Sequence, residues 1–195
     1  MGQAGCDYEF SLPLFAGWSP NLVIGVFGDY DAGSLRGTSS TISLVGIGMQ
    51  SGPENNSSSW FVGGRAGYVV NPRFLTYIDG GYTEARFDQV NYTSALIIPG
   101  FAGPTGFSLA AQTYNGWFLG SGFEYSFDWL PIPGLFLKTE YRYSQYNSTN
   151  VPFVLTATGA LVGTPGAPVT LTSQKNIQMV STELVWRFNF LGGHY

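Results

Sequence analysis

Charged residues are scarce in this chain of 195 residues: 8 Lys and Arg and 12 Asp and Glu make up 10% of it, against about 25% in an ordinary soluble domain. The net charge of -4 gives no basic surface for nucleic acid. No run of about 18 apolar residues exists, which excludes a transmembrane helix. The single cysteine, Cys6, excludes an internal disulfide and a cysteine-based metal site. The single histidine, His194, has no nucleophile in a suitable setting. We therefore expect no enzyme, no cofactor and no metal.

Aromatic residues (16%) and glycine (27 residues) are abundant instead. They recur with a period of two, as in 116–129, GWFLGSGFEYSFDW. Such alternation predicts a β-strand with two unlike faces. In this stretch Trp117, Phe123 and Trp129 lie on one face, and the carboxylates Glu124 and Asp128 lie on the other.

Seven segments show this alternation, and no segment has a helical apolar stripe. The predicted strands are 3–10, 22–31, 60–70, 74–87, 116–129, 135–146 and 177–190. Long connections follow the second, fourth and sixth strands, and short turns follow the third and fifth. All long loops therefore lie at one end of an up-and-down antiparallel sheet, as in transmembrane barrels. We predict an all-β chain that forms a single domain over 1–195.

The distribution of charge distinguishes a soluble barrel from a membrane barrel. The predicted strand faces carry 13 of the 20 charged residues, whereas 89–123 and 143–174 carry none. Soluble proteins place charge on loops and on the surface. A membrane barrel instead keeps polar side chains in its lumen and apolar ones towards lipid. The pattern favours the membrane barrel over a soluble, lipocalin-like one.

The apolar faces are also too aromatic for a small interior, because about eight strands enclose barely enough space for ordinary side chains. Trp and Tyr near strand ends suit the two membrane interfaces. We expect interface positions at Trp60, Trp117, Trp129 and Trp186.

Three segments carry a resemblance to a known family: GRAGYVVNPRFLTYIDGGYT, GWFLGSGFEYSF with LFLKTEYRYSQY, and the final ELVWRFNF. They resemble the porin-family, OmpA-like eight-stranded outer-membrane barrels of alphaproteobacteria, which are Gram-negative and in which such proteins are often described as surface antigens. The resemblance implies an outer-membrane location. It also implies that the barrel-assembly machinery reads the aromatic C-terminal strand, here Leu184, Trp186, Phe188 and Phe190.

The strand count departs from that family, because seven strands are evident and single-chain bacterial barrels have an even number. The loop pattern makes 3–10 look like a second strand. We therefore expect a first strand and a signal peptide upstream of Met1. Alternatively, part of 38–50 or 153–172 supplies the eighth strand.

The charged side chains of the polar faces are expected to form ion pairs in the lumen, because an unpaired charge in a narrow interior is costly. The predicted network comprises Asp29, Arg65, Asp79, Glu124, Lys138, Glu140, Arg142, Glu183 and Arg187. It would act either as a polar plug or as a charge filter around a solute path, and eight strands favour the plug.

The chain is thus expected to have a structural and surface role in the cell envelope. The alternative is a narrow, porin-like channel for small solutes or ions, in which the excess of acids would favour cations. Expected partners are outer-membrane lipid and lipopolysaccharide, and the assembly machinery during insertion.

Overall fold

Antiparallel strands account for most of the chain in the computed structural model, which describes residues 2–13, 20–32, 35–42, 49–94, 103–127 and 134–187. No described residue belongs to a helix that is long and apolar enough to cross a membrane. The strands are β1 (Gly2–Ser11), β2 (Asn21–Asp31), β3 (Leu35–Ile42), β4 (Met49–Asn71), β5 (Phe74–Phe87), β6 (Val90–Ser94), β7 (Gly103–Leu109), β8 (Gln112–Ser126), β9 (Leu135–Tyr146), β10 (Thr149–Leu155), β11 (Gly163–Thr164), β12 (Ala167–Pro168), β13 (Thr170–Ser173) and β14 (Asn176–Trp186).

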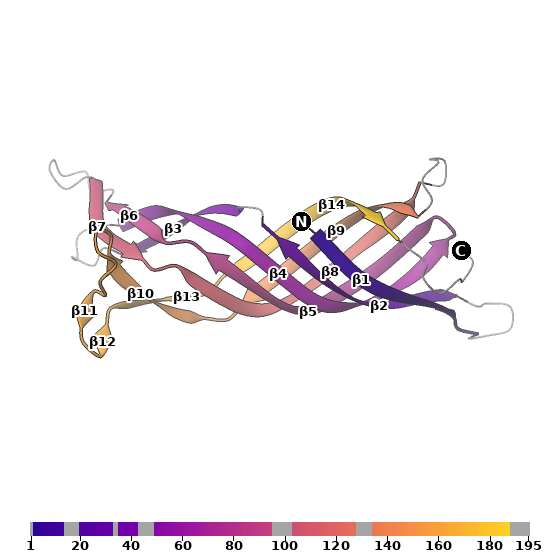
Figure 1. Ribbon diagram of the computed structural model, residues 1–195, viewed down its shortest axis with the longest axis horizontal. Coiled ribbons are helices and arrows are strands. Elements are labelled where there is room, and N and C mark those ends of the chain that lie inside the picture. Colours follow the sequence, from indigo (N-terminus) through magenta and orange to yellow (C-terminus); the bar gives the residue numbers. More distant parts are fainter. Residues whose placement is uncertain are drawn as a thin grey trace.

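Seven of these strands form the barrel wall, in the order β1-β2-β4-β5-β8-β9-β14, and every neighbouring pair is antiparallel. They correspond to the seven segments predicted from alternation. The tilted strands wrap around a common axis (Figure 1). Residues 128–129 and 188–190 of the predicted strands lie outside the described residues.

The period of two places one residue set outside and the other inside. On β8, Trp117, Leu119 and Phe123 are exposed on the outside, whereas Phe118 and Glu124 are buried in the lumen. The charged face is therefore the inner one, as the sequence predicted.

The strands continue well beyond the wall at the long-loop end. The predicted strand 60–70 begins at Met49 and has 23 residues as β4, which corresponds to about 75 Å, whereas a membrane crossing needs about 9–11 residues. Long connections that alternation left unassigned form the additional strands β3, β6, β7, β10 and β13, which continue the sheet. We call this part, which lies to the left in Figure 1, the outer extension.

The outer extension has its own apolar core, so it is a packed structure rather than a set of loops. Its buried residues are Ala85, Phe87, Val90, Tyr92, Leu109, Tyr114, Tyr146, Val151 and Phe153. A hydrogen bond of 3.0 Å joins the hydroxyl groups of Ser39 on β3 and Tyr92 on β6. An ion pair of 2.7 Å joins Lys175 to Glu54 at its base.

The barrel wall has one seam, because no backbone pairing joins β1 to β14 among the described residues. The two segments considered as an eighth strand do not fill it. Residues 38–42 lie in β3 and pair with β4, and 153–155 lie in β10 and pair with β7. That alternative is wrong, because both segments extend hairpins of the outer extension. Residues 43–48 lie outside the described residues.

Candidate functional site in the barrel lumen

Two rows of aromatic side chains surround the outside of the wall. The upper row, nearer the outer extension, contains Tyr30, Trp60, Tyr82, Trp117 and Tyr143, and the lower row contains Tyr68, Phe74, Phe123, Tyr125 and Trp186. Contacts within a row include Trp60 with Tyr82, at 5.3 Å between ring centroids. Trp129, the fourth predicted interface residue, lies outside the described residues.

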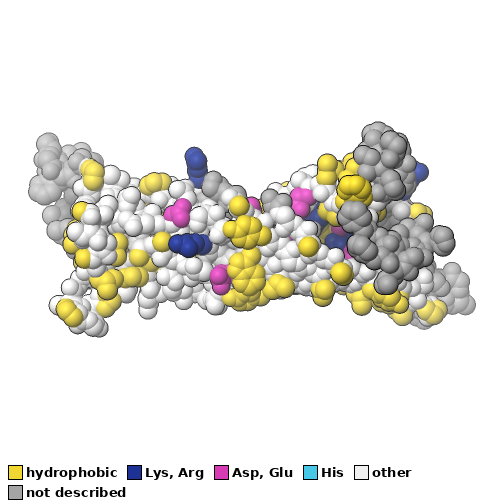
Figure 2. All heavy atoms as spheres, viewed as in Figure 1, with side chains coloured by type: hydrophobic (Ala, Val, Ile, Leu, Met, Phe, Trp, Pro, Cys, Tyr) yellow, Lys and Arg dark blue, Asp and Glu magenta, His cyan; other side chains and the backbone are white. Residues whose placement is uncertain are grey.

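The distance between the two rows is slightly less than the apolar band of about 25 Å that outer-membrane barrels present to lipid. Eight residues separate Trp117 from Tyr125 on β8, which is about 20 Å along the axis of a tilted barrel. Leu119 (58% exposed) and Ile78 (63% exposed) lie between the rows, facing outwards. Figure 2 shows a cluster of hydrophobic side chains near the middle of the molecule, with charged side chains on the surface to its left, over the outer extension, and further charged side chains visible to its right.

The lumen behind these rows contains two groups of ion pairs. The lower ion cluster consists of Asp7, Arg65, Glu124 and Arg187. Arg65 donates through Nε to Asp7 Oδ1 and through Nη1 to Glu124 Oε1, at 2.7 Å each. Arg187 Nη2 lies 2.6 Å from Glu124 Oε2 and 3.2 Å from Asp7 Oδ2. The carboxylates of Asp7 and Glu124 thus each form ion pairs with both Arg65 and Arg187. These ion pairs connect β1, β4 and β8 with the end of β14 across the lumen.

The upper ion cluster consists of Asp29, Asp79, Lys138, Glu140 and Arg142. Arg142 Nη1 donates to Asp29 Oδ2 at 2.9 Å, and its Nη2 lies 2.5 Å from Glu140 Oε1 and 3.8 Å from Asp79 Oδ2. Lys138 Nζ lies 2.8 Å from Glu140 Oε2, which also accepts a hydrogen bond of 2.9 Å from the hydroxyl of Tyr77. The Lys138, Glu140 and Arg142 side chains are each 1% exposed.

An aromatic layer covers the upper ion cluster. The guanidinium carbon of Arg142 lies 4.4 Å from the ring centroid of Phe61 and 4.8 Å from that of Phe118, with Phe27 at 5.7 Å. These three rings also pack on one another. Arg142 is thus enclosed by carboxylates and by aromatic rings, a desolvated setting in which cation–π contacts are strongest.

Inward-facing glycines make room for these large side chains. Gly122 on β8 is opposite Glu140 in the register. A Cβ atom at Gly122 would lie 2.5 Å from the Tyr77 hydroxyl and 2.6 Å from the Thr139 carbonyl oxygen. Gly63 has the same role, because a Cβ atom there would lie 2.8 Å from the ring of Phe118. The abundance of glycine on the polar faces therefore reflects a filled lumen.

Gly122→Ala is expected to destabilise the folded barrel by about 1–3 kcal/mol, because the added methyl group overpacks the lumen. Gly64→Ala is the matched control: Gly64 faces outwards, and the nearest atom to its Cβ would be the Gly25 carbonyl oxygen at 3.5 Å. This control is expected to be neutral or stabilising by up to about 1 kcal/mol. Urea unfolding in lipid vesicles, followed by tryptophan fluorescence, measures both. Equal stabilities would contradict the overpacking argument.

The structure brings eight of the nine predicted network residues into ion pairs, and Glu183 is the exception. Its Oε1 is buried and accepts no hydrogen bond from any residue that the structure describes. Three participants were missing from the predicted set: Asp7, Tyr77 and Gln3, whose Oε1 accepts a 3.0 Å hydrogen bond from Lys138. Their inward register was visible in the alternation. Phe27 and Phe118 also alternate with the outward set, but an aromatic side chain gives no sign in the sequence that it packs against an ion pair, and the same holds for Phe61.

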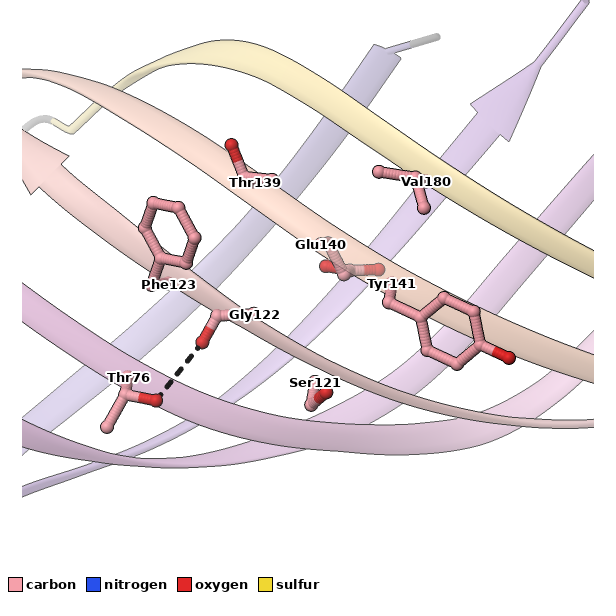
Figure 3. Close-up of a pocket in the computed structure, with 8 residues that line it drawn as sticks. All are labelled: Thr76, Ser121, Gly122, Phe123, Thr139, Glu140, Tyr141 and Val180. Atoms are coloured by element: carbon pink, nitrogen blue, oxygen red, sulfur yellow. Dashed lines mark hydrogen bonds between the residues drawn. The ribbon is translucent and has the colours of Figure 1, made fainter.

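A shallow depression lies on the outer wall, next to the upper ion cluster (Figure 3). Outward residues of β5, β8, β9 and β14 surround it, among them Phe123, Tyr141 and Val180. Thr76 donates a 3.3 Å hydrogen bond to the Gly122 carbonyl. The side chain of Glu140 lies behind the wall and is buried. The depression lies between the aromatic rows, where lipid would fill it, and it contains no exposed charged group.

In the outer extension, the buried tyrosines stay neutral to higher pH than usual. Burial raises the pKa of Tyr92, against the smaller opposing effect of the hydrogen bond with Ser39. Burial also raises the pKa of Tyr114. Among the described residues, no group of three His, Cys, Asp or Glu side chains could hold a metal ion.

The remaining predicted residues belong to the assembly signal on the last strand. Leu184 and Trp186 face outwards and are 67% and 56% exposed. Phe188 and Phe190 lie outside the described residues.

In a comparison with known families, the model of the outer membrane protein beta-barrel domain matches residues 2–190. No curated protein matches the chain. No solved structure matches it either.

Proposed function

This chain belongs to the outer membrane protein beta-barrel domain family and lies in the bacterial outer membrane, and from that premise we propose that it is a non-conducting structural barrel. It anchors the outer extension at the cell surface and contributes to the integrity of the envelope. The observation that carries this proposal is the burial of Lys138, Glu140 and Arg142, each 1% exposed, in the middle of the lumen. Charges that line a water-filled pore would be hydrated.

Three layers of side chains fill the lumen and leave no path for a solute. These layers are the lower ion cluster, the upper ion cluster with its aromatic layer, and the apolar core of the outer extension. Each layer links strands on opposite sides of the barrel. An ion would have to displace ion pairs and then cross an apolar core, both of which are costly in a low-dielectric interior.

We also propose the finer assignments that the resemblance suggested. The protein is an OmpA-like, porin-family surface antigen of a Gram-negative alphaproteobacterium, without enzymatic activity. Its partners are outer-membrane lipid and lipopolysaccharide on the aromatic rows, and the assembly machinery at Leu184 and Trp186.

Planar-bilayer recordings test the proposal. The full chain is expected to give no conductance steps above those of a bare bilayer. The double variant Arg142→Ala, Phe118→Ala removes only the middle layer, so it is also expected to give no steps, because the lower ion cluster and the apolar core of the outer extension still close the path. Steady, cation-selective steps from the unmodified chain, with a selectivity that changes in Glu124→Gln or Glu140→Gln, would instead identify a porin-like channel.

A further inference from the structure

The outer surface of the wall is uneven in charge. Strands β8, β9 and β14 are neighbours and are described over their whole length, and none of their outward residues is charged. On the outer face of β5, by contrast, Glu84 and Arg86 follow Tyr82 of the upper aromatic row. Glu84 Oε1 accepts a 3.3 Å hydrogen bond from Trp60 on β4, on the side away from β8. We call the outer faces of β8, β9 and β14 the uncharged sector.

Amide side chains accompany the upper aromatic row in the uncharged sector. In the register, Gln178 on β14 lies opposite Tyr143, and Asn176 lies opposite Gln145. Gln145 in turn lies opposite Trp117 on β8. Gln178 and Asn176 are exposed. Since an amide donates and accepts hydrogen bonds without carrying a charge, this position suits an uncharged headgroup that has hydroxyl groups.

Gln178 and the two neighbouring rings offer complementary surfaces to such a headgroup. Gln178 Oε1 accepts a 3.1 Å hydrogen bond from the hydroxyl of Tyr141, and no hydrogen bond joins its Nε2 to another described residue. The ring centroids of Trp117 and Tyr143 are 5.8 Å apart, and Trp117 is 47% exposed. Aromatic rings present a broad apolar surface, on which the C–H face of a sugar ring can pack. The amide nitrogen and the rings therefore match the two kinds of surface that a sugar has.

The depression in Figure 3 lies directly below these amides, on the membrane side. Val180, which borders it, is two residues from Gln178 along β14. The volume of the depression is about 320 Å³, at the lower end of the range for ligand sites. The hydroxyl groups of Thr76 and Thr139 at its edge are already hydrogen-bonded within the protein. A hydrocarbon chain can therefore lie there without depriving these groups of a partner.

We propose that the uncharged sector binds one lipid whose headgroup is an uncharged sugar. Its acyl chain lies in the depression, and its sugar lies against Gln178, Gln145 and the ring of Trp117. This inference rests on the contact with outer-membrane lipid proposed above and specifies where that contact is selective. A phosphate headgroup fits less well, because proteins bind phosphate with Arg and Lys side chains, and the outward faces of β8, β9 and β14 provide neither.

Competition between two lipids tests this proposal. The full chain is refolded in a polyoxyethylene detergent that contains equal amounts of monoglucosyl diacylglycerol and phosphatidylglycerol with the same acyl chains. Both headgroups have hydroxyl groups, so the phosphate charge is the main difference between them. Native mass spectrometry then counts the bound lipids. We expect one glucosyl lipid per chain, retained at least about fivefold more than phosphatidylglycerol, because the amides supply its hydrogen bonds. Equal retention, or a preference for phosphatidylglycerol, would overturn the proposal.

Three variants locate the site. Gln145→Ala combined with Gln178→Ala should lower the preference to about twofold or less. Asn55→Ala is the matched control, because it removes an amide of β4, outside the uncharged sector, and it should keep the preference. Ser121→Phe fills the depression and should lower retention of the glucosyl lipid. Heat-modifiable migration on gels checks that each variant is folded.

Two further outcomes separate this proposal from the one on which it rests. A preference that persists in the double amide variant would overturn the sugar site and leave the general lipid contact standing. Retention of neither lipid by the folded, unmodified chain would contradict both the sugar site and the lipid contact of the aromatic rows.

Discussion

Arg142→Met is expected to lower the free energy of unfolding by about 3–5 kcal/mol, because it leaves buried carboxylates without their cation. Arg142 is the only described base that contacts Asp29, Asp79 and Glu140 together. Methionine keeps most of the packing against the aromatic layer, so the loss reports mainly the charge. Urea unfolding in lipid vesicles gives the value.

The matched control is Arg86→Met. Arg86 lies on the outer face of β5 and is exposed, so its replacement should stay within about 0.5 kcal/mol of the unmodified chain. A second variant separates charge from packing: adding Asp29→Asn to Arg142→Met removes one uncompensated carboxylate and should restore part of the loss. If Arg142→Met were as stable as Arg86→Met, the upper ion cluster would not hold the barrel together.

Leu119→Arg is expected to destabilise the inserted barrel by about 1–3 kcal/mol, because Leu119 lies between the bilayer midplane and the upper aromatic row, two positions from Trp117, and the cost of a basic side chain falls towards the interface. Leu119 is 58% exposed between the two aromatic rows, so nothing in the protein would screen the new charge from lipid. The yield of heat-modifiable, folded protein after insertion into vesicles measures the effect, together with urea unfolding.

Leu155→Arg provides the matched control, because Leu155 is also a partly exposed leucine, at 40%, but lies in the outer extension. Its replacement should change stability little, since water surrounds that surface. A soluble barrel would respond differently: two charges added to two exposed positions would then have equally small effects. Equal tolerance of both substitutions would contradict the position of the membrane.

The sequence predicted the barrel wall well because period-two alternation is a local pattern that can be recognised in a single sequence. It identified all seven wall strands and their inner face, and Glu124 and Arg142 lie where that register places them. Alternation did not delimit the strands of the outer extension, because they are short and interrupted, although the apolar run 153–155 suggests a hairpin that extends beyond the membrane; β10, for example, carries apolar residues on both faces near Val151 and Phe153. Segments of this kind cannot be distinguished from loops by their sequence unless the strands that pair with them are known.

The pairing within the lumen could not be read from the sequence either. Arg65 and Glu124 are 59 residues apart, and Arg142 and Asp29 are 113 apart. The register of the intervening wall strands, β5 for the first pair and β4, β5 and β8 for the second, determines which base meets which acid. Glu183 shows the limit most clearly: its place in the alternation is like that of its neighbours, yet its Oε1 accepts no hydrogen bond from the described residues.

Thiol labelling with a charged, water-soluble reagent tests most directly the claim that lipid lies outside the wall and a packed plug lies inside it. Three single-cysteine proteins in a Cys6→Ser background suffice: Ser121→Cys, on the exposed outer face between the aromatic rows; Ser144→Cys, buried in the lumen; and Thr158→Cys, exposed in the outer extension. In vesicles we predict rapid labelling at position 158 alone. Rapid labelling at 144 would mean a water-filled channel, and rapid labelling at 121 would mean a soluble barrel.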